Sequence, residues 1–85
     1  MRLTVLFFAS LREALGCDRE VLVLPETVTT LGELRQWLAS RGGVWAEALA
    51  PGRAVRAALD QAMAGPEAAL HEGAEVAFFP PVTGG

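Results

Sequence analysis

The residues with the clearest chemical potential stand at the end of the sequence, where Gly84 and Gly85 close the chain. Because neither residue has a Cβ atom, a terminal carboxylate here can enter a narrow channel in another enzyme without crowding the carbonyl carbon under attack. We therefore expect the C-terminal carboxylate to be the functional group. A pair of glycines also occurs at frayed chain ends that do nothing, so the preceding residues must decide between these two interpretations.

A double proline before the glycines favours the functional interpretation. Residues 76–79 are apolar and partly aromatic, as expected of a strand, and the two prolines remove two successive backbone donors, so strand pairing must stop there. Each proline has a fixed φ, and Phe79 is held extended by the proline that follows it. We expect one domain at residues 1–79 and a stiffened tail at residues 80–85, which spans at most roughly 20 Å. The residues expected to thread into a partner are Pro80, Pro81, Val82, Thr83 and Gly84.

Composition argues against several functional classes. A chain of 85 residues that is 52% hydrophobic allows one small domain with one core. The formal charge is −3, and the seven basic residues are arginines scattered along the chain, so no basic stripe for nucleic acid is present. No segment approaches the roughly 20 apolar residues of a membrane span, and Cys17 has no second cysteine to pair with. We expect a cytoplasmic protein that binds neither nucleic acid nor a membrane.

The periodicity of apolar residues predicts the elements that must position the tail. Residues 2–8 alternate as a half-buried strand, residues 9–15 are typical of a short helix, and residues 20–24 of a second strand. Thr30 and Glu33 have the spacing of a capping box at the start of a longer helix. Residues 44–49 predict a further helical turn, residues 55–60 a third strand and residues 75–79 the last strand. Residues 61–64 either continue the third strand or form a short return strand.

This order of elements predicts an α+β fold. Two strands precede the main helix and the others follow it, so a compact arrangement is a mixed sheet curled around that helix, with the first and last strands central.

Two aromatic residues fall on the polar face of their predicted strands. Phe8 shares its face with Arg2 and Thr4, and Phe79 shares its face with Glu75. Exposed aromatic side chains need a reason. If the two strands are neighbours, Phe8 and Phe79 lie together near the tail and form a docking site, where each could contribute about 1.5–3 kcal/mol when buried by a partner.

Other residues with reactive or metal-binding side chains give weaker evidence of a function. Cys17 could relay sulfur, but a lone cysteine in a turn is more often incidental. His71 is expected to be a solvated loop residue without the neighbours of a metal site, and the carboxylates are too dispersed to form an acid and base pair. Trp37 and Trp45 are expected to lie in or at the edge of the core. We therefore predict no catalytic side chain, no metal ligand and no bound cofactor.

Two segments resemble the small subunit of molybdopterin synthase, a sulfur carrier with the ubiquitin-like β-grasp fold. They are Val5-Leu6-Phe7-Phe8-Ala9 with Leu11-Arg12-Glu13, and the ending from Glu72-Gly73 through Phe-Phe-Pro-Pro-Val-Thr-Gly-Gly. The resemblance implies that an ATP-dependent adenylating enzyme activates Gly85 and that a sulfur donor enzyme converts it to a thiocarboxylate. The tail would then deliver sulfur to cyclic pyranopterin monophosphate in the large synthase subunit, within a heterotetramer. It also places Met63 beside Phe8 and Phe79 in the partner interface.

Three other roles fit the same features. A sulfur carrier for thiamine synthesis or tRNA thiolation shares the fold and the tail, and only the Phe-Phe-Pro-Pro segment argues against it. A protein modifier would join Gly85 to lysines of other proteins, and because this chain has no lysine it could not build lysine-linked chains of itself. The third alternative is a passive interaction domain.

Overall fold

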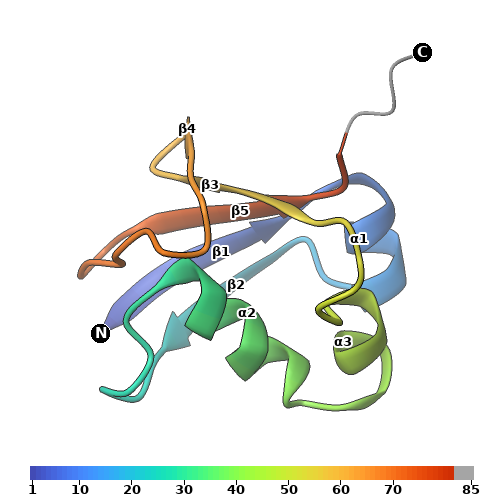
Figure 1. Ribbon diagram of the computed structural model, residues 1–85, viewed down its shortest axis with the longest axis horizontal. Coiled ribbons are helices and arrows are strands. Elements are labelled where there is room, and N and C mark those ends of the chain that lie inside the picture. The colour runs from blue at the N-terminus through green and yellow to red at the C-terminus, as the bar shows by residue number, and fades with distance from the viewer. Residues whose placement is uncertain (82–85) are drawn as a thin grey trace.

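The alternating residues near the N-terminus form β1 (Arg2–Phe7), which runs parallel to the last strand, β5 (Glu75–Phe79). A computed structural model describes residues 1–81 and shows that the pairing of these two strands organises the fold (Figure 1). The remaining elements are α1 (Ala9–Leu15), β2 (Arg19–Val23), α2 (Leu31–Ala39), α3 (Gly43–Ala48), β3 (Arg56–Leu59) and β4 (Ala62–Met63). The predicted tail residues Val82, Thr83, Gly84 and Gly85 lie outside the described residues.

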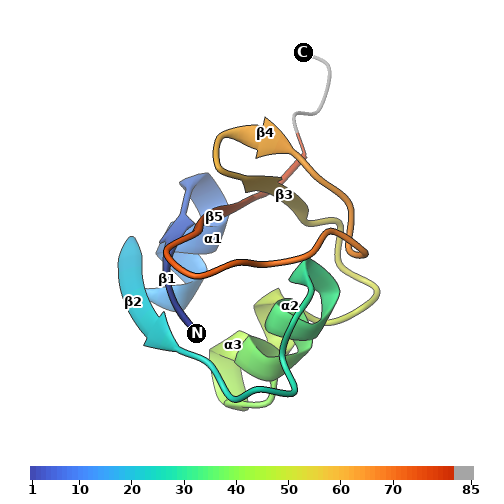
Figure 2. The ribbon, with the colours of Figure 1, turned by 90° about the vertical axis from the view of Figure 1, so that its left-hand side faces the viewer.

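Within residues 1–81 the strands form one mixed sheet of order β2-β1-β5-β3-β4. β1 and β5 are parallel, and the other neighbouring strands are antiparallel. The helices α2 and α3 lie on one side of this curved sheet (Figure 2). The predicted α+β fold, with a mixed sheet around one main helix and the first and last strands central, is confirmed.

The main helix, α2, begins at the capping box that the sequence predicts. The Thr30 hydroxyl accepts a hydrogen bond from the Glu33 backbone N–H at 3.2 Å, and the Glu33 carboxylate accepts one from the Thr30 N–H at 3.1 Å. Glu33 also accepts from the backbone and hydroxyl of Thr29, and these hydrogen bonds hold the pKa of Glu33 below its ordinary value. The cap satisfies backbone donors that the first turn of a helix leaves free.

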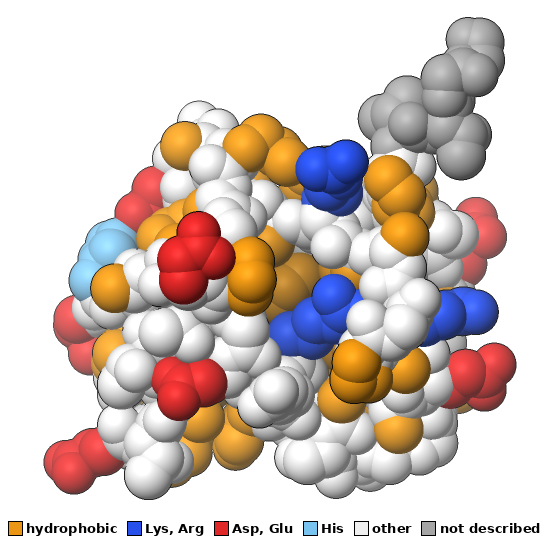
Figure 3. Space-filling model, viewed as in Figure 1, with side chains coloured by type: hydrophobic (Ala, Val, Ile, Leu, Met, Phe, Trp, Pro, Cys, Tyr) orange, Lys and Arg blue, Asp and Glu red, His pale blue; other side chains and the backbone are white. Residues whose placement is uncertain are grey.

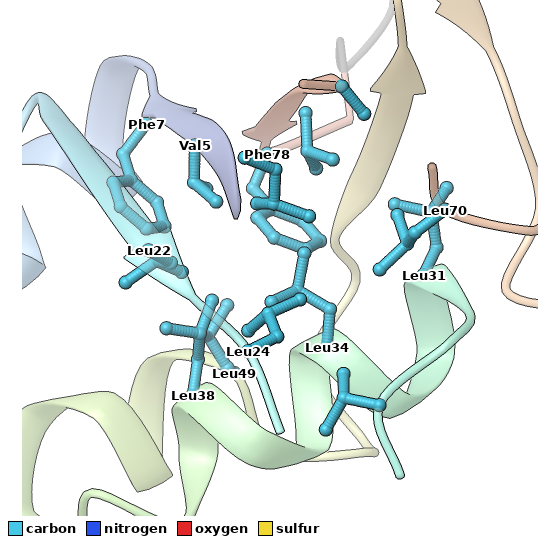
Figure 4. Packing of buried hydrophobic residues seen from close by; sticks show 14 of the residues in the cluster. Val5, Phe7, Leu22, Leu24, Leu31, Leu34, Leu38, Leu49, Leu70 and Phe78 are labelled. Atoms are coloured by element: carbon cyan, nitrogen blue, oxygen red, sulfur yellow. The ribbon is translucent and has the colours of Figure 1, made fainter. Parts of the chain in front are cut away.

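The core lies between α2 and the sheet (Figure 4). Val5 and Phe7 of β1 point toward α2, where Leu34 and Leu38 are fully buried. Phe78 of β5 is 2% exposed and stacks on Phe7, with ring centroids 6.2 Å apart. Because side chains alternate along a strand, burying this set leaves the intervening side chains on the opposite face of the sheet.

The hairpin after β3 settles which alternative residues 61–64 adopt. They contain the short return strand β4, joined to β3 by a tight turn at Asp60 and Gln61. Both turn residues have positive φ values, 49° and 69°, which residues other than glycine rarely adopt. Across residues 1–81, none of the helices is long and apolar enough to cross a membrane.

Candidate docking face and tail exit

The face of the sheet turned away from α2 and α3 carries the sequence-predicted interface residues. We call it the outer face. Its side chains are identified by the strand register, since directly opposed residues on neighbouring strands point to the same side. They are Arg2, Thr4 and Leu6 of β1; Arg19, Val21 and Val23 of β2; Arg56 and Ala58 of β3; Met63 of β4; and Glu75, Ala77 and Phe79 of β5.

One row of the outer face crosses four strands and is entirely apolar. Leu6 opposes Ala77, Ala77 opposes Ala58, and Ala58 opposes Met63. Met63 is 62% exposed although methionine is a hydrophobic residue. The parity count along the sequence leaves the face of Met63 undecided, and the register places it on the same face as Phe79.

Phe8 and Phe79 lie one row beyond this one, on the side from which the tail leaves. Phe7 and Phe78 are register partners, so Phe8 and Phe79 occupy the next position on adjacent parallel chains, and the Phe8 N–H donates to the Phe78 carbonyl oxygen at 3.1 Å. Phe8 is 45% exposed, and Phe79 is half-buried. We call Leu6, Phe8, Ala58, Met63, Ala77 and Phe79 the apolar patch. The structure therefore places the three residues predicted for the partner interface on one face of the sheet, whereas their contact with a partner stays a prediction.

The chain turns sharply at Phe8, and no sequence signal marks this turn. Phe8 is the N-cap of α1, and its carbonyl oxygen accepts hydrogen bonds from the N–H groups of Leu11 and Arg12. Ala9 follows with φ of 53°, in a left-handed region where a Cβ atom is strained. This turn directs α1 away from β1 and leaves Phe8 on the outer face.

The tail leaves from the middle of the sheet. β5 ends at Phe79, with β3 paired to it up to Phe79 on one side and β1 up to Phe78 on the other. Pro80 and Pro81 follow outside the strand and are half-buried. Pro80 lines a shallow groove together with Ala14 of α1 and Arg53. The predicted threading roles of Val82, Thr83 and Gly84, and the role of Gly85, concern residues outside the described part and stay predictions.

Titratable groups gather at the opposite end of the sheet from the tail. His71 Nε2 lies 2.5 Å from Asp60 Oδ2, and His71 Nδ1 lies 3.0 Å from the Glu72 carbonyl oxygen. Asp60 Oδ1 accepts from the Glu75 N–H at 3.0 Å. This backbone hydrogen bond and the nearby His71 lower the pKa of Asp60, whereas Asp60 raises the pKa of His71. His71 is exposed, as predicted, but it fastens the loop before β5 to the β3–β4 turn.

The remaining candidate residues, Trp37, Trp45 and Cys17, make contacts within the protein. Trp37 and Trp45 pack against the core, as the sequence predicts, and both face the Arg41 guanidinium, at 5.6 and 4.4 Å from its central carbon. Arg41 also forms a bidentate ion pair with Glu20 at 2.9 and 2.6 Å, which lowers the pKa of Glu20.

Cys17 is half-buried, and its thiol donates a long hydrogen bond to the Arg19 carbonyl oxygen. Among residues 1–81, His, Cys, Asp and Glu side chains form no group of three or more that could hold a metal ion.

A mixed sheet curled around one main helix, with the C-terminal strand in its middle, defines a ubiquitin-like β-grasp protein. Solved structures agree with this class. SAMP1 from Haloferax volcanii superimposes with a TM-score of 0.78 over 100% of both chains at 20% identity. Subunits 1 and 2 of the molybdopterin-converting factor from Helicobacter pylori 26695 have been solved as a complex, and one chain of it matches with a TM-score of 0.67 over 100% of both chains at 24% identity.

Sequence comparison identifies the family within this class. Residues 5–85 match the ThiS family. The molybdopterin synthase sulfur carrier subunit of Haemophilus influenzae is 43% identical over 83 residues, which cover 98% of this chain and 99% of the relative. The protein of the same name from Escherichia coli K12 is 43% identical over 81 residues, covering 95% and 96%. The chain therefore belongs to the ThiS family, among the molybdopterin synthase sulfur carrier subunits.

Proposed function

We propose that this protein carries sulfur on its C-terminal glycine and delivers it to the pterin precursor of the molybdenum cofactor. An adenylating enzyme uses ATP to form an acyl-adenylate at Gly85, because a free carboxylate is too poor an electrophile to accept sulfur. A sulfur donor enzyme then displaces the nucleotide and leaves a thiocarboxylate. In the large synthase subunit this sulfur is transferred to cyclic pyranopterin monophosphate, where its anionic character makes it nucleophilic.

The observation that carries this proposal is the similarity at 43% identity, over nearly the full length of both chains, to two proteins named as sulfur carrier subunits of molybdopterin synthase. The geometry of the described residues is compatible with it. Pro80 and Pro81 begin the tail at the end of a central strand, beside the exposed Phe8.

The proposal divides the chemistry between this chain and its partners. The carrier binds through the apolar patch and aims its tail, while catalytic side chains and ATP belong to the partner enzymes. In the large subunit, docking of the apolar patch would hold the tail in an active site at high effective concentration. The solved complex from Helicobacter pylori, which joins two subunits of the molybdopterin-converting factor, supports a large subunit as the partner.

Intact-mass analysis of the protein from its native cell tests the carrier role. A thiocarboxylate replaces one oxygen atom by sulfur, whereas attachment to another protein through an isopeptide bond adds the mass of that protein. We expect the first change. Finding only the second would replace the carrier proposal with that of a protein modifier.

A matched pair of glycine variants tests the tail. Gly84→Ala adds a Cβ atom in a segment proposed to thread through a narrow channel, and Gly52→Ala adds one that meets no atom within 4 Å apart from its own residue and the two adjacent ones. Both variants should have the melting temperature of the wild type. We expect Gly84→Ala alone to slow adenylation of Gly85 and transfer of sulfur from a preformed thiocarboxylate, each measured in single turnovers. Wild-type rates in both steps would show that the glycine pair is not a steric requirement.

A further inference from the structure

Three arginines on the outer face, Arg2, Arg19 and Arg56, have no acidic partner among residues 1–81. The ion pairs of this part of the chain join Arg41 to Glu20 and His71 to Asp60. Arg35 directs its guanidinium to backbone carbonyl oxygens at 2.6 to 3.0 Å. The side chains of Arg2, Arg19 and Arg56, in contrast, are exposed and form neither kind of contact.

The strand register places two of these arginines, Arg19 and Arg56, at the border of the apolar patch. Arg56 opposes Phe79 on β5, beside the point where the tail begins. Arg19 opposes Leu6 on β1, at the β2 edge of the sheet. Positive charge therefore lies next to apolar side chains at the tail end of the outer face.

Negative charge gathers toward the other end of the same strands. Glu75 opposes Thr4, one row beyond the row of Leu6 and Ala77, and Asp60 follows the end of β3. The Glu72 carboxylate accepts from the Arg2 backbone N–H at the start of β1. The exposed guanidinium of Arg2 lies at the same end and offsets only part of the negative charge of Glu72, Glu75 and Asp60. In the view of Figure 3, acidic side chains and the histidine lie on the left, whereas basic side chains lie in the middle and on the right, where acidic ones also occur.

We propose that the outer face docks on a surface of the large synthase subunit that presents carboxylates opposite Arg19 and Arg56, around an apolar centre that receives Phe79 and Met63. This inference rests on the proposed function and adds the chemistry of the partner surface. Burying an arginine side chain without an acidic partner costs free energy. A partner that buries the apolar patch must therefore present negative charges to the arginines at its border. The acidic far end of the face would be repelled by the same carboxylates. The charges therefore fix the orientation in which the tail points into the partner.

Association kinetics with the large subunit from the same organism test this inference. Arg56→Glu reverses a charge on the outer face. Arg53→Glu makes the same change of net charge beside Pro80, in the loop before β3, on an exposed side chain off the outer face, so the pair compares two charges near the tail of which one lies on the proposed docking surface. At ionic strength of about 10 mM, where the Debye length is about 30 Å, we expect Arg56→Glu to slow association about tenfold more than Arg53→Glu. At about 1 M salt, where the length is about 3 Å, the difference in association rate should largely disappear. Arg19→Glu should slow association as Arg56→Glu does. All three variants should have the melting temperature of the wild type.

The outcomes separate this inference from the function on which it rests. Equal association rates for Arg56→Glu and Arg53→Glu would mean that only net charge matters, and would overturn the proposed carboxylate surface while leaving the carrier role intact. A difference that persists unchanged at high salt would also overturn it, since steering by charge is screened. If the wild-type chain does not bind the large subunit, the proposed function and the inference fall together.

Discussion

Truncation of two adjacent phenylalanines should separate stability from binding. Phe78 and Phe79 are neighbours on β5, but Phe78 is 2% exposed in the core and Phe79 lies half-buried on the outer face. We expect Phe78→Ala to destabilise the fold with little direct effect on the docking surface. We expect Phe79→Ala to weaken association with the large subunit while leaving the fold largely intact.

The structure sets the size of each effect. Removing a phenylalanine from a packed core costs about 3–5 kcal/mol, and Phe78 also loses its stacking on Phe7. A domain of this length has an unfolding free energy of roughly 4–13 kcal/mol, so Phe78→Ala would remove a large share of it. Phe79→Ala should cost about 1 kcal/mol of stability but more than about 1 kcal/mol of binding, which is roughly a fivefold or greater rise in Kd.

Urea melts and calorimetric titration with the large subunit measure the two quantities. Phe78→Leu, which keeps an apolar side chain in the core, serves as a second variant if Phe78→Ala does not fold. Binding of Phe79→Ala with the wild-type Kd would remove Phe79 from the interface. A loss of stability as large as that of Phe78→Ala would refute the assignment of Phe79 to the outer face.

Two further predictions concern the β3–β4 turn. Gln61→Gly should stabilise the fold by about 0.5–1 kcal/mol in urea melts, because glycine enters positive φ without strain, and Asp60→Gly should not, because it removes a carboxylate that accepts two hydrogen bonds. His71→Gln should lower the melting temperature most between about pH 4 and pH 6.5 and little at about pH 9. The raised pKa of His71 gives stability below its ordinary pKa that is lost as the pH rises through the raised value. The lowered pKa of Asp60 keeps that carboxylate charged down to acidic pH. An equal loss at both pH values would show that the charge on His71 does not matter.

Features fixed by local chemistry could be predicted from the sequence. The capping box at Thr30 and Glu33 needs only residues three positions apart, and the alternation in β1 identifies Val5 and Phe7 as buried. The same parity places Phe79 on the outer face. These predictions hold because the periodicity of a strand or helix is set by its own backbone.

Features that depend on distant partners could not be predicted. The face of Met63 follows from a turn at Asp60 and Gln61 that lacks the glycine or asparagine typical of positive φ, so the sequence gives no count of the residues in that turn. The position of Arg41 between Trp45 and Glu20 depends on residues that meet only after folding. The charge arrangement on the outer face likewise needs the register of β2 and β3 against their neighbours.

The central position of β5 also has a mechanical consequence. A partner that grips the tail pulls along β5, which is bonded to β1 on one side and to β3 on the other. The ladders on both sides run along the direction of the pull, so their hydrogen bonds would be loaded in shear together and could not open one after another. An edge strand has one ladder to resist the same force. In the proposed function, the domain would thus serve as an anchor that stays folded while a partner enzyme binds and releases its last residues.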